Sequence, residues 1–142
     1  MQIDDIMTAS PLTVRDDTTV GEAWETLKRL DVRHLPVVNA DGELVGIVSD
    51  RDFGTPPTPP LMAELLGTHL TPLDASISTI MTGTPLSVEP GDDVEDAIDV
   101  MVENKVGAVP VVDHEGRVVG IVSYLDVLRE LRAQTEGEEA SP

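Results

Sequence analysis

The sequence contains no cysteine and almost no aromatic residues. Trp, Tyr and Phe each occur once among the 142 residues. The absence of cysteine excludes disulfide bonds, thiolate catalysis and a cysteine-based zinc site. Hydrophobic residues still make up 40% of the chain. We therefore expect a substantial core built from the recurring clusters of Val, Ile and Leu, with little stacking on aromatic rings.

Basic residues are also scarce. The chain has 9 Lys and Arg against 27 Asp and Glu, which gives a formal net charge of -18. Binding to a nucleic-acid backbone requires clustered Lys and Arg, so we expect no nucleic-acid partner. Such an acidic, lysine-poor composition is typical of proteins from salt-loving organisms, and an ordinary acidic, solvated surface explains it equally well.

Long hydrophobic runs are absent. No apolar stretch approaches the roughly 20 residues needed to span a bilayer. The N-terminal stretch "MQIDDIMTAS" has acidic residues where a signal peptide has basic ones. These features predict a soluble, cytoplasmic protein without a membrane partner.

The usual motifs of catalysis and metal binding are missing as well. His34, His69 and His114 do not have the His-x-x-x-His spacing of a metal site. There is no glycine-rich phosphate loop, no dinucleotide-binding turn and no Gly-x-Ser-x-Gly elbow. We therefore expect no enzyme, no catalytic residue and no metal site of the protein's own.

What the chain does contain is an internal repeat. Residues 3–52 align with residues 77–126 without an insertion, and the copies share "IMT", "PL", "PVV" and "GIVS" at matching places. Each copy is too small to bury its own apolar faces, so the two must pack together. The shared Gly46 and Gly120 lie within strands, where a missing side chain usually marks a bulge or the close approach of another group.

Within each copy the pattern predicts strand, helix, strand, strand, helix. "PLTV" and "PLSV" are short extended segments. Apolar residues at helical spacing then predict an amphipathic helix, for which Thr19 and Glu22 form a capping box in the first copy. Two β-branched strands follow, around a turn containing Gly42 or Gly116. A second helix comes next, cut short in the first copy by Gly54 and the prolines after it.

We accordingly expect an α+β fold of two pseudo-twofold-related β-α-β-β-α repeats packed through their sheets. The predicted ranges are 1–54 for the first repeat, 55–75 for a Pro-rich linker with a short helix in "LMAELLGTHL", 76–134 for the second repeat and 135–142 for a flexible acidic tail.

The ordered motifs resemble a known family. On "DIMT", "HLPVVNADGELVGIVSDRD" and "AVPVVDHEGRVVGIVSYLD", the chain from Ile3 to about Leu131 is similar to a tandem pair of cystathionine β-synthase (CBS) domains, a Bateman module. The resemblance implies a regulatory module that binds AMP, ADP, ATP or S-adenosylmethionine between the repeats. It also implies a homodimer and an effector protein on another chain. No cofactor is required, although a nucleotide could bring its own Mg²⁺. Two alternatives stay open: a ligand-independent interaction or dimerisation module, and an enzyme of unknown reaction.

The best site candidates lie where each hairpin ends. Ser49 and Ser123 stand at the change from strand to helix, where a hydroxyl and unpaired N–H groups suit a phosphate. Asp52 and Asp126 follow three residues later, where a carboxylate can accept hydrogen bonds from ribose hydroxyls. By resemblance these residues match the family's phosphate-side hydroxyl and ribose-binding carboxylate. The alternative is that Ser-x-x-Asp only caps a helix.

The remaining candidates flank these junctions. The resemblance implies that four apolar residues lie against the base of the ligand: Leu35, Pro36, Val109 and Pro110. It also implies that the backbone at Leu12 and Leu86 pairs with the edge of the base. Ordinary core strands explain each of them equally well. Arg33 and His34 could neutralise phosphates, or could simply be polar residues at the start of a strand. The second copy has Gly107 and Ala108 at these two positions.

Overall fold

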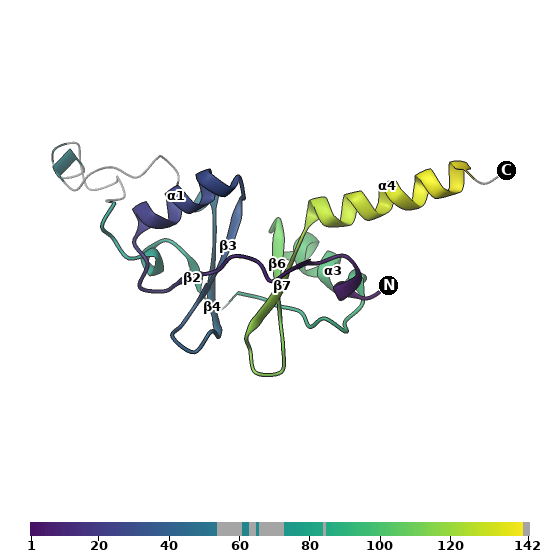
Figure 1. The fold of residues 1–142 in the computed structure, drawn as a ribbon, viewed down its shortest axis with the longest axis horizontal. Coiled ribbons are helices and arrows are strands. Elements are labelled where there is room, and N and C mark those ends of the chain that lie inside the picture. Colours follow the sequence, from purple (N-terminus) through teal and green to yellow (C-terminus); the bar gives the residue numbers. More distant parts are fainter. Residues whose placement is uncertain (54–60, 63–64, 66–72, 84, 141–142) are drawn as a thin grey trace. The chain divides into compact units, whose positions relative to one another are not determined.

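The structure is a computed structural model that describes residues 1–53, 61–62, 65, 73–83 and 85–140. The chain divides into two compact units, one of Leu12–Pro85 and one of Met1–Pro11 with Leu86–Pro142. Each unit has one sheet, and the ribbon in Figure 1 follows the elements along the chain.

The unit Leu12–Pro85 holds a four-stranded sheet and one α-helix. Its strands lie in the order β2-β3-β4-β5, with β2 parallel to β3 and the other pairs antiparallel. The elements are β2 (Val14–Arg15), α1 (Val20–Leu30), β3 (His34–Val38), β4 (Leu44–Ser49), the short 3-10 helices η2 (Asp50–Phe53) and η3 (Ile77–Thr79), and β5 (Thr82–Gly83).

Helix α1 forms where the apolar spacing predicts it. The Glu22 N–H donates to Thr19 Oγ1 at 3.2 Å, which satisfies one of the N-terminal donors that a helix leaves unpaired. The buried face of α1 packs on the sheet in one aliphatic cluster, whose fully or nearly fully buried members are Val20, Ala23, Leu27, Leu35, Val37, Val48, Phe53 and Ile77. The core therefore uses the period of 3.6 on the helix and alternate residues on the strands.

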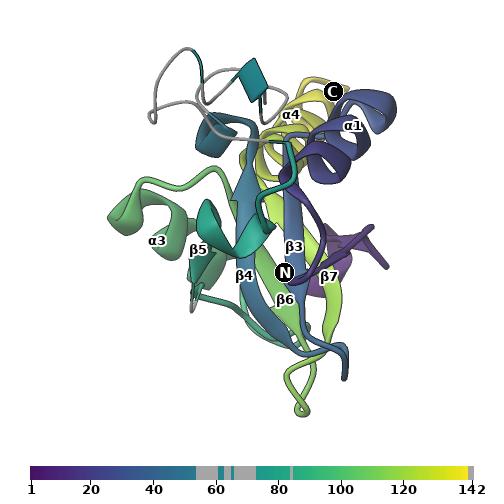
Figure 2. The same cartoon turned by 90° about the vertical axis from the view of Figure 1, so that its left-hand side faces the viewer.

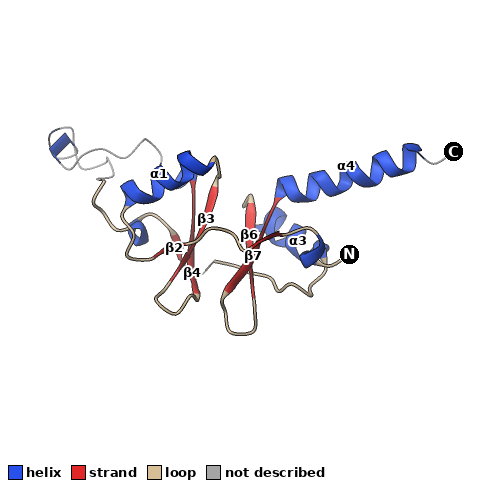
Figure 3. Ribbon diagram, viewed as in Figure 1, coloured by secondary structure: helices blue, strands red, loops and turns tan. Residues whose placement is uncertain are grey.

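The other unit is built in the same way. Its sheet has the order β1-β7-β6, and Val88 adds an isolated parallel bridge to Val111. The elements are η1 (Ile3–Asp5), β1 (Thr8–Ala9), α3 (Val94–Asn104), β6 (Ala108–Val112), β7 (Val118–Ser123) and α4 (Tyr124–Ala140). Figure 3 shows the hairpin and the two α-helices of this unit by secondary structure. The core cluster consists of Ile3, Val88, Ala97, Met101, Val109, Val111 and Val122.

The repeats exchange their "IMT" segments. Strand β5, which follows "IM" of the second repeat, pairs with β4 of the first, and Figure 2 shows the two strands side by side. Strand β1 of the first repeat pairs with β7 of the second. Backbone hydrogen bonds reinforce both exchanges: the Ile77 N–H donates to Thr18 O at 2.8 Å and the Ile3 N–H donates to Asp92 O at 2.9 Å.

The two shared strand glycines lie beneath these exchanged segments. A Cβ on Gly46 would lie 3.0 Å from Met81 Cγ and 3.1 Å from Thr82 O. On Gly120 it would lie 3.1 Å from Met7 Cγ and 3.2 Å from Thr8 O. The duplicated glycine and the duplicated "IMT" therefore fit one another across repeats, which is the close approach that the strand glycines predict.

The predicted α+β class with two β-α-β-β-α repeats is confirmed, with the four-residue η2 as the second helix of the first repeat. Because of the segment exchange, each compact unit contains residues of both predicted repeats, 1–54 and 76–134, and these ranges stay a prediction. Most of "LMAELLGTHL" lies outside the described residues. Helix α4 continues to Ala140 and so includes most of the predicted tail, helped by a Thr135 Oγ1 hydrogen bond to Leu131 O at 3.0 Å. Among the described helices, none has the length and apolar character to cross a membrane.

Candidate functional site

The second hairpin ends in a reciprocal cap. Ser123 is the last residue of β7 and Tyr124 begins α4. The Ser123 N–H donates to Asp126 Oδ2 at 2.8 Å and the Ser123 hydroxyl donates to the same oxygen at 3.1 Å. In return, the Asp126 N–H donates to Ser123 Oγ at 3.3 Å. The Asp126 side chain is 11% exposed, so the cap fixes a carboxylate that is largely withdrawn from water.

The first hairpin ends in nearly the same arrangement. The Ser49 N–H donates to Asp52 Oδ2 at 2.7 Å and the Ser49 hydroxyl donates to it at 3.3 Å. The residues that follow form only the four-residue 3-10 helix η2. The carboxylate geometry is therefore set by the hairpin end and not by a long helix.

Each carboxylate keeps one oxygen outside its cap. Among the described residues, Asp52 Oδ1 accepts no hydrogen bond. Asp126 Oδ1 lies 3.8 Å from Arg129 Nη1, which is an ion pair and longer than a hydrogen bond. The geometry thus contains the capping interaction, and the same interaction orients an acceptor oxygen. Capping and ligand binding are compatible roles for these residues.

His34 lies beside the first junction. It is the cross-strand partner of Ser49, so the two side chains share a face of the sheet. Burial lowers the pKa of His34 from its usual value; Asp50 and Asp52 oppose this by attracting the proton, whereas Arg33 and Arg51 reinforce it. The structure therefore gathers His34, Ser49, Asp52 and the start of β3 at one end of the hairpin.

The second junction has no such group. Ala108 is the cross-strand partner of Ser123, and the Tyr124 N–H donates to Gly107 O at 3.1 Å. The Asp50 N–H donates to Arg33 O at 3.0 Å in the equivalent place. The same backbone hydrogen bond therefore forms at both junctions, and the side chains around it differ.

The apolar candidates divide into two groups. Leu35 and Val109 belong to the core clusters, and Pro36 and Pro110 are also fully buried, which fits the alternative of ordinary core strands. Leu12 and Leu86 precede β2 and the Val88 bridge and are 48% and 54% exposed, so their side chains remain accessible. Contact of any of these residues with a base stays a prediction.

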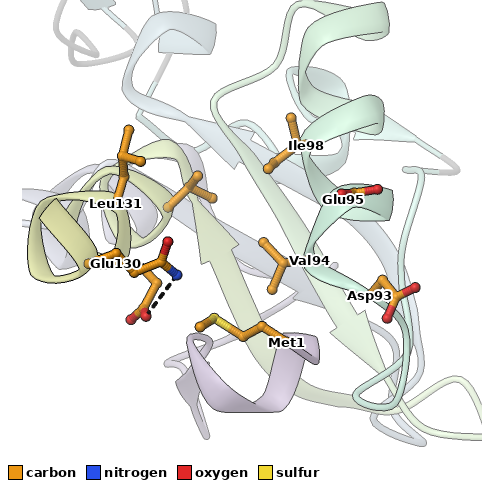
Figure 4. A pocket seen from close by; sticks show the side chains of 9 residues that line it. Met1, Asp93, Val94, Glu95, Ile98, Glu130 and Leu131 are labelled. Carbon is orange, nitrogen blue, oxygen red and sulfur yellow. Dashed lines mark hydrogen bonds between the residues drawn. The ribbon is translucent and has the colours of Figure 1, made fainter. Parts of the chain in front are cut away.

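A groove that sequence reasoning missed lies between α3 and α4. Its volume is about 470 Å³. Figure 4 shows its lining, which comprises Met1, Asp93, Val94, Glu95, Ile98, Val127, Glu130, Leu131 and Gln134. The helical spacing of its apolar residues looked like an ordinary core face, so nothing in the sequence distinguished it. None of the predicted site residues lines it, and the described residues contain no cluster of three or more metal-ligating side chains.

Two α+β repeats that exchange strands and end each hairpin in a capped Ser-x-x-Asp define a duplicated module. The profile of the CBS domain family matches residues 3–53 and 77–133. The chain belongs to the CBS domain family and carries two copies of the domain.

Relatives and solved structures agree with this assignment. A CBS domain-containing protein of Dictyostelium discoideum is 35% identical over 124 residues, which cover 87% of this chain and 86% of that protein. The CBS domain pair of protein MJ0100, in complex with 5'-methylthioadenosine and S-adenosyl-L-methionine, matches with a TM-score of 0.77 and 28% identity, covering 94% of this chain and 98% of that one. CBSX2 of Arabidopsis thaliana, in complex with AMP, matches with a TM-score of 0.76 and 30% identity over the same shares of the chains.

Some relatives are much longer. The chain spans 23% of the length of an inosine-5'-monophosphate dehydrogenase of Methanocaldococcus jannaschii, to which it is 28% identical over 126 residues.

Proposed function

We propose that this protein is a regulatory module that binds an adenosine-containing ligand at its Ser-x-x-Asp junctions and signals to a partner protein. The observation that carries the proposal is the pair of carboxylates, Asp52 and Asp126, each held by a serine through Oδ2, with Oδ1 outside the cap. A fixed carboxylate oxygen is a strong acceptor for ribose hydroxyls, because hydrogen bonds to charged groups contribute about 1.5–3 kcal/mol each.

The ligands of the related structures support the same chemistry. MJ0100 binds 5'-methylthioadenosine and S-adenosyl-L-methionine, and CBSX2 binds AMP. These three ligands share adenosine and differ in what is attached at the 5' carbon. A common recognition site must therefore engage the base or the ribose, and the junction carboxylates suit the ribose.

Regulation follows if the ligand binds one arrangement of the protein better than another. Such a ligand shifts the population toward the arrangement that it prefers, by as much as its affinities differ. In this proposal the protein is a cytoplasmic homodimer with no chemistry of its own. The effector is another polypeptide, and any Mg²⁺ arrives with a nucleotide.

Thermal unfolding with added ligand tests the proposal. A ligand that binds only the folded protein at about 100 times its Kd stabilises it by about 2.7 kcal/mol. Adenosine, AMP, ADP, ATP, S-adenosylmethionine and 5'-methylthioadenosine should be compared at low and at high salt, because the charge of -18 repels anionic ligands most at low salt. Stabilisation by at least one compound supports binding. No stabilisation by any of them at millimolar concentration would favour the ligand-independent interaction module.

Matched variants then locate the site. Asp126→Asn should weaken binding of the stabilising ligand, singly or combined with Asp52→Asn. Asp96→Asn is the control, because Asp96 Oδ2 accepts the Asp93 N–H at 3.2 Å in a similar cap at the start of α3. Unchanged affinity in the double variant Asp52→Asn/Asp126→Asn would contradict the assignment of the ribose site.

A further inference from the structure

The two junctions share a backbone hydrogen bond and differ in the residues around it. In the first repeat, Asp50 and Arg51 lie between Ser49 and Asp52, and Arg33 and His34 lie at the start of β3. The counterparts in the second repeat are Tyr124, Leu125, Gly107 and Ala108. Two arginines against one aspartate give the first set a net charge of +1 before His34 takes up a proton, and the second set has no charged side chain. The surroundings of the repeated Ser/Asp pair therefore differ in chemistry.

The basic groups of the first set come from two segments that meet at the end of the hairpin. His34 faces the same side of the sheet as Ser49. The hydrogen bond from the Asp50 N–H to Arg33 O brings the start of β3 against the start of η2. Arg33 and Arg51 both act electrostatically on His34, as do Asp50 and Asp52. An anionic group placed at this end of the hairpin would meet the positive charges of Arg33 and Arg51 and the imidazole of His34, which can donate a hydrogen bond.

The second set presents apolar surface instead. Tyr124 and Leu125 are 40% and 41% exposed at the start of α4. Arg129, the nearby basic residue, forms its ion pair with Asp126. The capping carboxylate repels a second negative charge at both junctions, but the second has no counterpart of Arg33, His34 and Arg51 to offset that repulsion. Moving a small apolar substituent from water to this surface would cost less free energy than moving a phosphate there.

We infer that the two junctions select different ligands by their 5' substituent. The Ser49/Asp52 junction takes an adenosine ligand with an anionic 5' group, and the Ser123/Asp126 junction takes one whose 5' group is uncharged and apolar. This inference rests on the proposed function, since it assumes that both junctions hold a ribose.

Titration calorimetry with AMP and with 5'-methylthioadenosine tests the inference, because the two probes share adenosine and differ in charge. Asp52→Asn should lower the affinity for AMP by about tenfold or more and change the affinity for 5'-methylthioadenosine by no more than about twofold. Asp126→Asn should do the reverse. If both variants change both ligands alike, the inference is wrong and the proposed function stands. If neither ligand binds the wild type, the inference is wrong, and the proposed function fails as well if none of the other adenosine compounds binds.

Exchanging flanking residues provides a second test. Arg51 and Leu125 are both exposed, so swapping them should not disturb the core. Arg51→Leu and His34→Asn should each lower the affinity for AMP at the first junction by about threefold to tenfold. The affinity for 5'-methylthioadenosine should not change. In an Asp52→Asn background, Leu125→Arg should raise the affinity for AMP at the second junction. If all three variants fold normally and none of them changes the affinity for AMP, the inference is wrong.

Discussion

Replacing Gly46 with alanine tests the exchange of segments between the repeats. The added Cβ would lie 3.0 Å from Met81 Cγ and 3.1 Å from the backbone Thr82 O. The methionine side chain can move aside, but the carbonyl oxygen belongs to the strand that pairs with β4 and cannot move without loosening that pairing. Overpacking of this kind costs about 1–3 kcal/mol.

The control is Gly91→Ala, because a Cβ at Gly91 would have no heavy atom within 4 Å. Alanine also restricts the unfolded chain, which stabilises the folded state by about 0.4–1 kcal/mol where the backbone permits it. Urea unfolding should therefore show Gly46→Ala destabilised by about 1–3 kcal/mol relative to Gly91→Ala. At this chain size the difference corresponds to a Tm lowered by roughly 3–9 °C. Equal stability of the two variants would refute the claim that the "IMT" segment closes over this glycine.

Three further predictions concern the caps, a turn and the histidine. Asp126→Ala and Asp96→Ala should each lose about 1 kcal/mol of stability in urea unfolding through a lost cap, but only Asp126→Ala should lose nucleoside binding. Asn39→Ala should destabilise the protein by about 1–2 kcal/mol, because Asn39 Oδ1 accepts hydrogen bonds from the N–H groups of Asp41 and Glu43 in the turn of the first hairpin, at 2.9 and 3.0 Å. A Tm equal to that of the wild type would contradict this role. Because the pKa of His34 is lowered in the folded protein, the unfolded chain protonates this side chain more readily. The wild type should therefore lose stability relative to His34→Asn as pH falls below about 6.5. If the free energies of unfolding of the two proteins change in parallel with pH, the effect is absent.

Most of the fold could be predicted from the repeat. Two copies of the same periodic pattern fix the order of elements, and Val20, Ala23 and Leu27 at helical spacing fix the buried face of α1. The segment exchange could not be predicted, because "IMT" and "GIVS" are identical in both copies and either pairing satisfies the pattern. The extension of α4 was missed because polar residues beyond the core, such as Gln134 and Thr135, suit a tail as well as a solvent-exposed helix.

The site could be predicted only in part. Serine at a strand end with aspartate three residues later predicts a cap, and the cap is present in both repeats. The sequence could not decide whether Leu35 and Val109 face a ligand or the core, because alternate residues of a strand point to opposite faces and both faces of these strands are apolar. The packing of the helices on the sheets places both residues in core clusters.

The central claim is that the junction carboxylates bind a ribose. The most direct measurement compares AMP with 2',3'-dideoxy-AMP by titration calorimetry on the wild-type protein, because the two compounds differ only in the ribose hydroxyls that would donate hydrogen bonds to a junction carboxylate. We expect AMP to bind and the dideoxy compound to bind at least about tenfold more weakly, as the loss of one charge-assisted hydrogen bond requires. Equal affinities for the two compounds would contradict the claim.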